Sequence, residues 1–458
     1  MPQNGSVASG NVSITGNGTN HMIIEQKTNK SIINWDSFSI HSGGRVDFKQ
    51  PSSKSFSLNR VEGSTPSNIS GSLNSNGKVM LINPNGIAIT PKGVVNTGSF
   101  TASTLDIKNK DFLQDNFKFQ SEKLTGGVVN EGRITIGSGH AALLGGYVSN
   151  SGIVTARLGK IMLGTGEKIT LDFVGDGLMS ISVPLSKLSH IRDIEGRTLK
   201  SLISNNGTLK AEGGLIQISA ATAQSLSRGS VNLGKDSFIM ANNYHKKKGK
   251  VILGGVHNKI LNIDGKIDVS GNTSLSPSGS ILISGTKINH SGQILANGKA
   301  GGNIKIFSKD QISLNGDILA KGKSTEGGEV IMLSENSIKS TSKTLIDVSG
   351  INKGGRIRSL SSMTNYSSGQ LKANSKAGYG GNIDLTGKKL QLSSQNVEAK
   401  GKLQGGKVRI GGDYLGGKEL SIMDNKNHKG FKSRFGKQEH LENASITLVD
   451  STTKIDVS

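Results

Sequence analysis

The carboxylates are the side chains whose chemistry must be considered first, because paired carboxylates can cleave glycosidic bonds. Asp268 and Asp347 recur in matching surroundings, each after an isoleucine and before Val-Ser-Gly. An aspartate that returns with a repeat is typical of a residue that forms turns rather than one that attacks a substrate. We therefore predict that the protein is not an enzyme and has no catalytic residue; a β-helical polysaccharide lyase or hydrolase is the alternative.

Metal and cofactor chemistry has even less support in the sequence. The nine histidines lack the spacing of metal ligands, and there is no cysteine to form a thiolate site or a disulfide. The full Gly-x4-Gly-Lys-Ser/Thr pattern of a phosphate-binding loop does not occur either. We expect neither a metal nor a cofactor.

The composition predicts an unusual core. Glycine makes up 63 of the 458 residues, about twice its ordinary share, whereas aromatic residues are only 4%. Such a chain lacks the bulk to fill a wide globular core but can fill a narrow core that repeats many times. A disordered Gly/Ser-rich chain is the alternative, and the β-branched periodicity described below argues against it.

The stretch Gly77–Ile89 shows the unit from which the chain is built. Val79–Ile82 is a short apolar run typical of a buried strand. Asn-Pro-Asn-Gly at positions 83–86 then forms a corner, because proline fixes φ while asparagine and glycine accept left-handed conformations. A second strand, Ile87–Ile89, follows at once. Strands joined by corners, without helices between them, are how a chain coils into a β-solenoid.

Two repeats extend this pattern along the sequence. The first is an apolar or small residue followed by Asn-x-Gly-x and an apolar residue, and it occurs at Val95–Phe100, Val129–Ile134, Ser149–Val154 and Ser204–Leu209. Its asparagines lie 34, 20 and 55 residues apart. We interpret 20 residues as one bare coil and the longer spacings as coils that carry insertions, at residues 108–123 and 184–202.

The second repeat is more regular and begins near residue 250. A glycine, any residue and then Val or Ile recur, with the apolar positions separated by 30, 23, 26, 27, 26 and 25 residues. These apolar positions are Val251, Ile281, Ile304, Val330, Ile357, Ile383 and Val408. A period of this length, rich in Gly, Ser, Asn and β-branched residues, predicts an all-β parallel β-helix in which each coil stacks on the one before.

The N-terminal segment of the chain contains a local concentration of aromatic residues. Trp35, Phe38, Phe48 and Phe56 are four of the thirteen Phe and Trp residues and fall within 22 positions. The first coils of a solenoid have nothing to stack on, so their formation is the costly step. We predict that these four residues form the cap and folding nucleus of the β-helix, with Trp35 closing its open end.

The chain is strongly basic. The net charge is +22, but the lysines are spread along the chain and lack interleaved aromatics, so we predict no specific nucleic-acid partner. Attraction to host surfaces or anionic glycans stays open.

The sequence has no apolar run long enough to span a membrane and starts without a signal peptide. The residues Lys454–Ser458 repeat Lys266–Ser270 and then stop, so we expect a fragment of a longer protein.

An ordered set of motifs in the first part of the chain resembles the secretion domain of the filamentous haemagglutinin and high-molecular-weight adhesin family, which is exported by two-partner secretion. The motifs are Gly5–Val7, Ile33–Trp35 with Ser37-Phe38, Gln50-Pro51, Leu58-Asn59-Arg60-Val61, Leu81-Ile82-Asn83-Pro84-Asn85-Gly86 and Ala102–Asp106. The resemblance covers roughly residues 3–260. The Asn-Pro-Asn-Leu motif of the haemolysin branch is absent, with Asn68–Gly71 in its place, which favours the adhesin branch.

This resemblance implies a right-handed parallel β-helix with an N-terminal cap and short insertions outside the helix. It implies a secretion domain at residues 1–260, followed by a β-helix repeat region at residues 261–458. It further implies an adhesin-like protein that is secreted or displayed on the bacterial surface after passing through a partner outer-membrane β-barrel transporter. Asn83, Pro84, Asn85 and Gly86 would then be the secretion motif, and Asn59 and Arg60 match the family. A carrier of a contact-dependent toxin beyond Ser458 is a further alternative.

Overall fold

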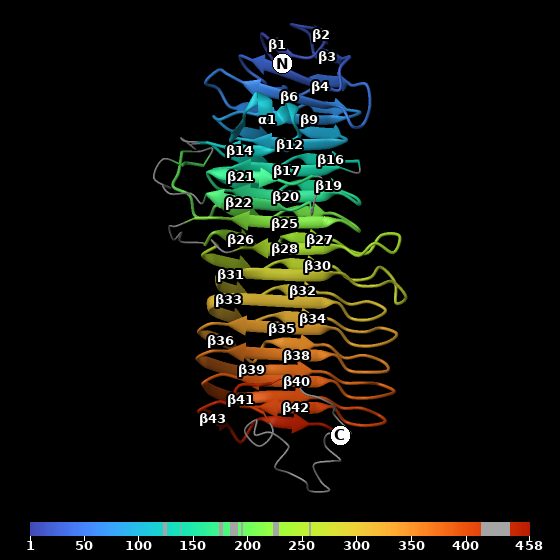
Figure 1. Ribbon diagram of the computed structural model, residues 1–458, viewed down its shortest axis with the longest axis vertical. Coiled ribbons are helices and arrows are strands. Elements are labelled where there is room, and N and C mark those ends of the chain that lie inside the picture. Colours follow the sequence, from blue (N-terminus) through green and yellow to red (C-terminus); the bar gives the residue numbers. More distant parts are fainter. Residues whose placement is uncertain are drawn as a thin grey trace. The chain divides into compact units, whose positions relative to one another are not determined.

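Two compact units of parallel strands form the protein in a computed structural model (Figure 1). The structure describes residues 1–121, 126–137, 139–173, 177–183, 191–193, 196–222, 229–255, 258–413 and 440–458. The first unit contains Met1–Asn272 and Ser276–Leu295, and the second contains Thr273–Leu275 and Ala296–Ser458. Both are built from short parallel strands stacked coil upon coil, which confirms the predicted parallel β-helix.

The first unit has three parallel sheets, each with one strand per coil. The first sheet contains β7 (Ser67–Ile69), β10 (Ile87–Ile89), β15 (Val128–Asn130), β18 (Val148–Asn150), β23 (Ile203–Asn205), β26 (Val231–Leu233), β29 (Ile260–Ile263) and the second half of β31 (Ser280–His290). The second contains β3 (His21–Gln26), β5 (Arg45–Lys49), β8 (Ser72–Ser75), β11 (Val94–Thr97), β16 (Arg133–Ile136), β19 (Ile153–Ala156), β24 (Thr208–Lys210), β27 (Phe238–Met240), β30 (Lys266–Asp268) and β32 (Gln293–Leu295). The third contains β4 (Lys30–Trp35), β6 (Phe56–Val61), β9 (Lys78–Ile82), β12 (Ser99–Ser103), β17 (His140–Gly145), β20 (Lys160–Thr165), β25 (Leu215–Ala220), β28 (Lys250–Gly254) and the first half of β31.

The core of the first unit is a set of vertical columns of apolar side chains. One column, in the third sheet, runs through Val79, Phe100, Ala141, Ile161, Ile216, Val251 and Ile281, each at most 1% exposed. Alternate side chains of a strand point to opposite faces, so each coil contributes one apolar side chain to this column, most often Val or Ile. The low aromatic content of the sequence is therefore compatible with a fully buried core.

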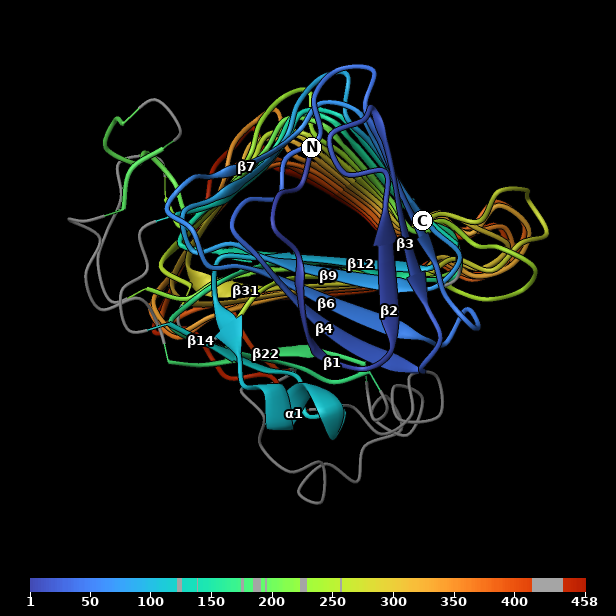
Figure 2. The ribbon, with the colours of Figure 1, turned by 90° about the horizontal axis from the view of Figure 1, so that it is seen from above.

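Antiparallel strands cover the N-terminal end of the first unit. β1 (Ser6–Ser9) pairs with β4, and β2 (Val12–Thr15) pairs with β3, both in antiparallel fashion. Figure 2 shows β1 and β2 lying across the end of the coils. Because an unpaired end of a β-helix exposes apolar surface and free backbone groups, these strands act as its cap.

A small sheet and a helix lie outside the β-helix of the first unit (Figure 2). The sheet is antiparallel and consists of β13 (Asp106–Ile107), β14 (Lys118–Gln120), β21 (Lys168–Leu171) and β22 (Met179–Val183), and the helix is α1 (Asn109–Leu113). The predicted insertion at 108–123 contains α1 and β14, whereas β21 and β22 arise from a segment that we did not predict as an insertion. Much of the predicted insertion at 184–202 lies outside the described residues.

The second unit continues the same architecture with longer strands. One sheet contains β33 (Asn303–Leu314), β35 (Glu329–Ser334), β38 (Arg356–Ser361), β40 (Asn382–Thr386) and β42 (Lys407–Ile410). The others contain β36 (Ser337–Ser340), β39 (Thr364–Lys372), β41 (Lys389–Glu398) and β43 (Ile446–Val449), and β34 (Asp317–Leu319), β37 (Leu345–Asp347) and β44 (Lys454–Asp456). The predicted glycine repeat is confirmed here, because Ile304, Val330, Ile357, Ile383 and Val408 are direct neighbours in the ladder.

The asparagine repeat is confirmed in part. Asn130, Asn150 and Asn205 lie in register in the first sheet, and each amide donates to the next, at 2.7 Å and 2.6 Å. The copy at Asn96 is different, since this residue lies in β11 of the second sheet, opposite Thr135. Our interpretation of 34 residues as one coil with an insertion was therefore wrong for this copy. A buried amide must find partners, and the column provides them from coil to coil.

Candidate functional site

The Asn-Pro-Asn-Gly corner joins β9 to β10 and is held together by the side chain of Asn83. This side chain is completely buried. Its Nδ2 donates to the carbonyl of Thr65 and the hydroxyl of Ser67, both at 3.0 Å, while its Oδ1 accepts from the backbone N–H of Asn85 at 3.0 Å. One amide thus fixes the corner and ties it to the preceding coil.

Asn85 and Gly86 complete the corner. The Nδ2 of Asn85 donates to the carbonyl of Gly63 at 2.8 Å and to the Oδ1 of Asn83 at 3.0 Å. Of the four corner residues only Gly86 has a positive φ, +124°, so the left-handed conformation falls on the glycine and not on an asparagine. Pro84 is exposed at the tip of the corner. The two asparagines therefore act through hydrogen bonds rather than through their tolerance of unusual dihedral angles.

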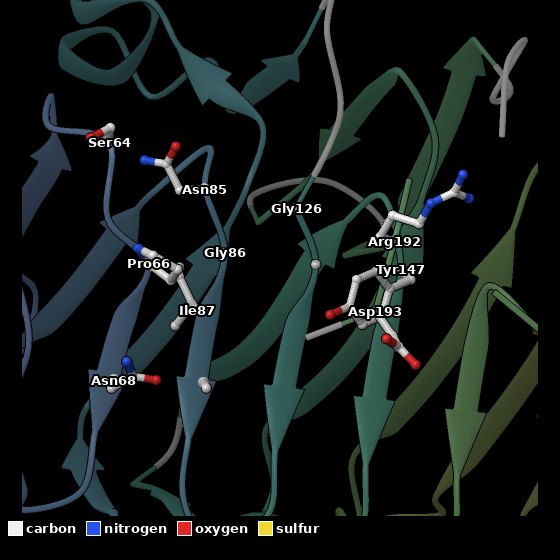
Figure 3. A pocket seen from close by; sticks show the side chains of 12 residues that line it. Ser64, Pro66, Asn68, Asn85, Gly86, Ile87, Gly126, Tyr147, Arg192 and Asp193 are labelled. Carbon is white, nitrogen blue, oxygen red and sulfur yellow. The ribbon is translucent and has the colours of Figure 1, made fainter. Parts of the chain in front are cut away.

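An open groove of about 630 Å³ lies beside this corner (Figure 3). Asn85, Pro66 and Ser64 lie on one side of it, and Tyr147, Arg192 and Asp193 lie on the other. The groove presents amide and backbone groups together with the guanidinium of Arg192, whereas the carboxylate of Asp193 is bound by Arg197 at 2.8 Å.

The floor of the groove is shaped by two glycines. A Cβ on Gly126 would lie 2.6 Å from the carbonyl oxygen of Pro84, and a Cβ on Gly127 would lie 2.4 Å from the ring of Tyr147. Only glycine fits at these positions without a shift of the backbone or the ring. The carbonyl of Gly127 also accepts from the backbone N–H of Ile87 at 3.0 Å, so corner and floor are one hydrogen-bonded piece.

The family-matching pair Asn59 and Arg60 points in two directions from β6. Asn59 is completely buried, and its Oδ1 accepts from the Nε1 of Trp35 at 3.1 Å. Arg60 points outward and binds the insertion: its Nε donates to Asp106 at 2.9 Å, and its two terminal nitrogens donate to the Asn109 side chain at 3.0 Å and to the carbonyl of Ile107 at 2.7 Å. Asn59 thus anchors the cap, and Arg60 anchors β13 and α1 to the β-helix.

The structure brings together only two of the four aromatic residues predicted to form the cap. Trp35 and Phe38 are both 1% exposed and meet edge to face, with ring centroids 5.4 Å apart. Phe48 is buried separately in β5. Phe56 points to the other side of β6, against Phe112 of α1 at 5.2 Å and Phe117 at 5.6 Å. The expected single cluster was therefore wrong for Phe56, which packs beneath the insertion.

A buried histidine beneath the same insertion was missed at the sequence level. His140 stacks on Phe173 with ring centroids 3.8 Å apart, and its Nε2 lies 3.0 Å from the Thr101 hydroxyl. Burial, followed by the nearby charges of Lys78 and Lys160, lowers the pKa of His140 to about 3. The imidazole is therefore neutral and structural. No sequence signal distinguishes it, since its partners Thr101, Phe173 and Phe56 come from three different segments.

The recurring aspartates form turns. The carboxylate of Asp268 accepts from the backbone N–H of Ser270 at 2.9 Å, and that of Asp347 accepts from the backbone N–H of Ser349 at 2.9 Å. Within the described ranges, no group of three or more His, Asp or Glu side chains is placed to hold a metal ion. In the same residues, no helix is long and apolar enough to cross a membrane.

The fold and the capped N-terminal end define the class of protein: an all-β parallel β-helix with an antiparallel cap. Residues 1–238 match the family of TPS secretion domains, where TPS denotes two-partner secretion, and the chain belongs to this family. Such exoproteins are secreted or exposed at the cell surface.

Individual relatives agree with this assignment. A heme/hemopexin-binding protein of Haemophilus influenzae strain Rd is 34% identical over 219 residues, covering 46% of this chain and 23% of the relative. A second protein of that description from Haemophilus influenzae is 27% identical over 454 residues, covering 88% of this chain and 47% of the relative. The chain thus spans less than half the length of both. The crystal structure of the HMW1 secretion domain from Haemophilus influenzae has a TM-score of 0.59 and 26% identity, covering 98% of this chain and all of that one.

Proposed function

We propose that residues 1–260 direct export through a partner outer-membrane β-barrel transporter and that residues 261–458 form part of the β-helix carried out with them. The observation that carries the proposal is the match of residues 1–238 to the TPS secretion domain family. The chain has no cysteine, and each coil contacts mainly its neighbours. Such a chain can cross a pore unfolded and then fold coil by coil on the outside.

The Asn-Pro-Asn-Gly corner is the part of this domain that we propose the transporter requires. Pro84 is exposed at its tip, and the groove beside it is lined by Asn85. Asn83 lies underneath, completely buried, and contributes by holding the corner in shape. A transporter that binds here would contact Pro84 and the groove, so changes at Asn83 should act indirectly.

The N-terminal coils would serve as the nucleus on which later coils stack. Trp35 and Phe38 pack under the cap, and Asn59 links Trp35 to the next coil. Every further coil then adds one layer to an existing template, which is the favourable step of a one-dimensional propagation.

Export is tested by supplying a signal peptide and the partner transporter in a Gram-negative host and measuring the protein in the culture medium. The chain should reach the medium only when the transporter is present. Equal amounts without the transporter would contradict the proposal. Replacing both Asn83 and Asn85 by alanine should reduce secretion, and unchanged secretion of a folded double variant would show that the motif is only a structural corner.

Capture of heme or hemopexin is a second candidate function. It is favoured by one observation, the alignment of a relative with that description over 88% of this chain. Purified protein should then retain hemopexin on a column at physiological salt, whereas serum albumin of similar size should pass through. Failure to retain hemopexin would remove this candidate and leave the export proposal untouched.

A further inference from the structure

Five loops on one side of the second unit form a ladder of their own. These loops, here called the arcs, are residues 296–302, 320–328, 348–355, 373–381 and 399–406. They extend beyond the strands and lie one over another in yellow to orange in Figure 1. Parallel bridges join Gly298 to Gly322, Gly350 to Ser375, and Ser375 to Gly401, and the N–H of Gly322 donates to the carbonyl of Ser349 at 2.9 Å. The arcs are therefore in register at these positions, but the register shifts after Gly350, because the N–H of Ile351 donates to the carbonyl of Thr325 at 2.7 Å.

The backbone of the arcs is held tightly. Backbone N–H groups of one arc donate to backbone carbonyls of the arc before it. These hydrogen bonds join Lys323 to Gly298 at 2.7 Å, Lys376 to Gly350 at 3.1 Å, and Leu403 to Gly378 at 3.0 Å. The arcs end in pairs of glycines whose Cα atoms lie against the next coil; a Cβ on Gly327, for example, would overlap the carbonyl of Val348. The backbone positions from which the arc side chains extend are therefore fixed by hydrogen bonds and close packing.

This register places lysines in one column. The residues that follow the bridged positions are Lys299, Lys323, Ile351, Lys376 and Lys402, so four of the five rungs carry a lysine. All four lysines are exposed. Neighbouring rungs of a β-ladder lie about 4.8 Å apart, so Lys299 lies one rung from Lys323, and Lys376 lies one rung from Lys402, with Ile351 between the two pairs. Lys353 adds a fifth exposed ammonium beside Ile351, on the third arc.

The charge of this column is not compensated locally. The arcs contain seven lysines and a single acidic residue, Glu326. Lys321 and Lys400 bind Asp347 and Asp456, each at 2.9 Å. Among the described residues, none of the four column lysines forms an ion pair. Like charges on adjacent rungs repel one another, so the four column lysines do not stabilise the arcs through their charges.

We propose that the lysine column binds a linear, sulfated or carboxylated polysaccharide, with successive anionic groups along the column. Two pairs of lysines on adjacent rungs, separated by the rung of Ile351, fit an extended polymer that carries several anionic groups along its length. Single-stranded nucleic acid would require aromatic platforms for its bases, and Tyr379 is the only aromatic residue in the arcs. An exported chain would meet such a polysaccharide outside the cell.

The test measures binding of heparin to the purified 458-residue chain by isothermal titration calorimetry at several salt concentrations. The ladder variant replaces Lys299, Lys323, Lys376 and Lys402 by glutamine. The matched control replaces Lys54, Lys92, Lys309 and Lys343 by glutamine. These lysines are also exposed, and the two variants have the same net charge. The ladder variant should raise the heparin Kd about tenfold or more and reduce the salt dependence of binding by roughly three to four released ions, while the control should change Kd less than about threefold.

Three outcomes would overturn the proposal. Wild-type protein that does not bind heparin at physiological salt has no such site. An equal loss of affinity in the ladder variant and the control would show attraction by net charge alone. If the ladder variant loses affinity for double-stranded DNA as strongly as for heparin, the column is a general polyanion surface rather than a polysaccharide site. Because binding is measured on purified protein, these results do not depend on whether the transporter exports the chain.

Discussion

Replacing Asn83 by alanine separates the structural role of the corner from its exposed surface. The substitution removes a completely buried amide that donates to Thr65 and Ser67 and accepts from the N–H of Asn85. It leaves the carbonyl of Thr65 without this donor and the N–H of Asn85 without its acceptor. A buried polar group that loses its partner costs about 1–3 kcal/mol, so we expect a loss of about 2–4 kcal/mol in the free energy of unfolding.

Two matched substitutions calibrate this value. Asn85→Ala removes two hydrogen bonds from a half-buried side chain, to Gly63 and to Asn83, and should cost about 1 kcal/mol. Asn96→Ala changes an exposed asparagine whose single contact, with Asn74, is 3.5 Å long, and should cost less than about 0.5 kcal/mol.

The assay is urea unfolding of the three variants, followed by circular dichroism at one temperature and pH. The expected order of destabilisation is Asn83→Ala, then Asn85→Ala, then Asn96→Ala. If Asn83→Ala unfolds at the same urea concentration as Asn96→Ala, the buried amide of Asn83 does not hold the corner. Secretion adds a second readout: Pro84→Ala should lower export without changing the urea midpoint.

Three further predictions concern the cap, the insertion and its histidine. Trp35→Ala should cost about 3–5 kcal/mol in urea unfolding, whereas Trp35→Phe, which loses the bond to Asn59, should cost clearly less; equal losses would contradict the role of the cap. Arg60→Ala should make the segment around α1 the first site cut in limited proteolysis, and an unchanged cleavage pattern would contradict its anchoring role. His140 stays neutral in the folded state because burial lowers its pKa to about 3, while the unfolded chain takes up a proton below about pH 6.5. Its contribution to stability is therefore complete above pH 6.5 and lost as the pH falls toward 3, roughly 3 kcal/mol by pH 4; His140→Gln should abolish this part of the acid sensitivity, and an unaltered pH profile of unfolding would refute it.

The coil architecture could be predicted from the sequence because it depends on local patterns. The glycine before each inward Val or Ile repeats with every coil, so Val330, Ile357 and Ile383 identify the ladder directly. The asparagine pattern is less reliable, since Asn96 shares the local sequence of Asn130 but lies in another sheet. The same local sequence can precede a strand of the first sheet or of the second sheet. Which sheet follows depends on how many corners the chain has passed since the start of the coil.

The interactions across the insertion could not be predicted. Phe56 packs on Phe112 and Phe117, and His140 stacks on Phe173, across separations of 33 to 61 residues in the chain. No periodicity links these positions, because the insertion does not follow the repeat of the coils. The groove beside the corner was missed for the same reason, since Tyr147, Arg192 and Asp193 reach it from outside the motif.

The most direct test of the account compares secretion of two parts of the chain. Residues 1–260 and residues 96–458 are each given the same signal peptide and expressed with the partner transporter, and the protease-resistant protein in the medium is measured. We expect residues 1–260 to be secreted and protease-resistant, whereas residues 96–458, which lack the cap and the corner, should be neither. Secretion of residues 96–458 in a folded, protease-resistant form would contradict the claim that the N-terminal coils direct export and begin folding.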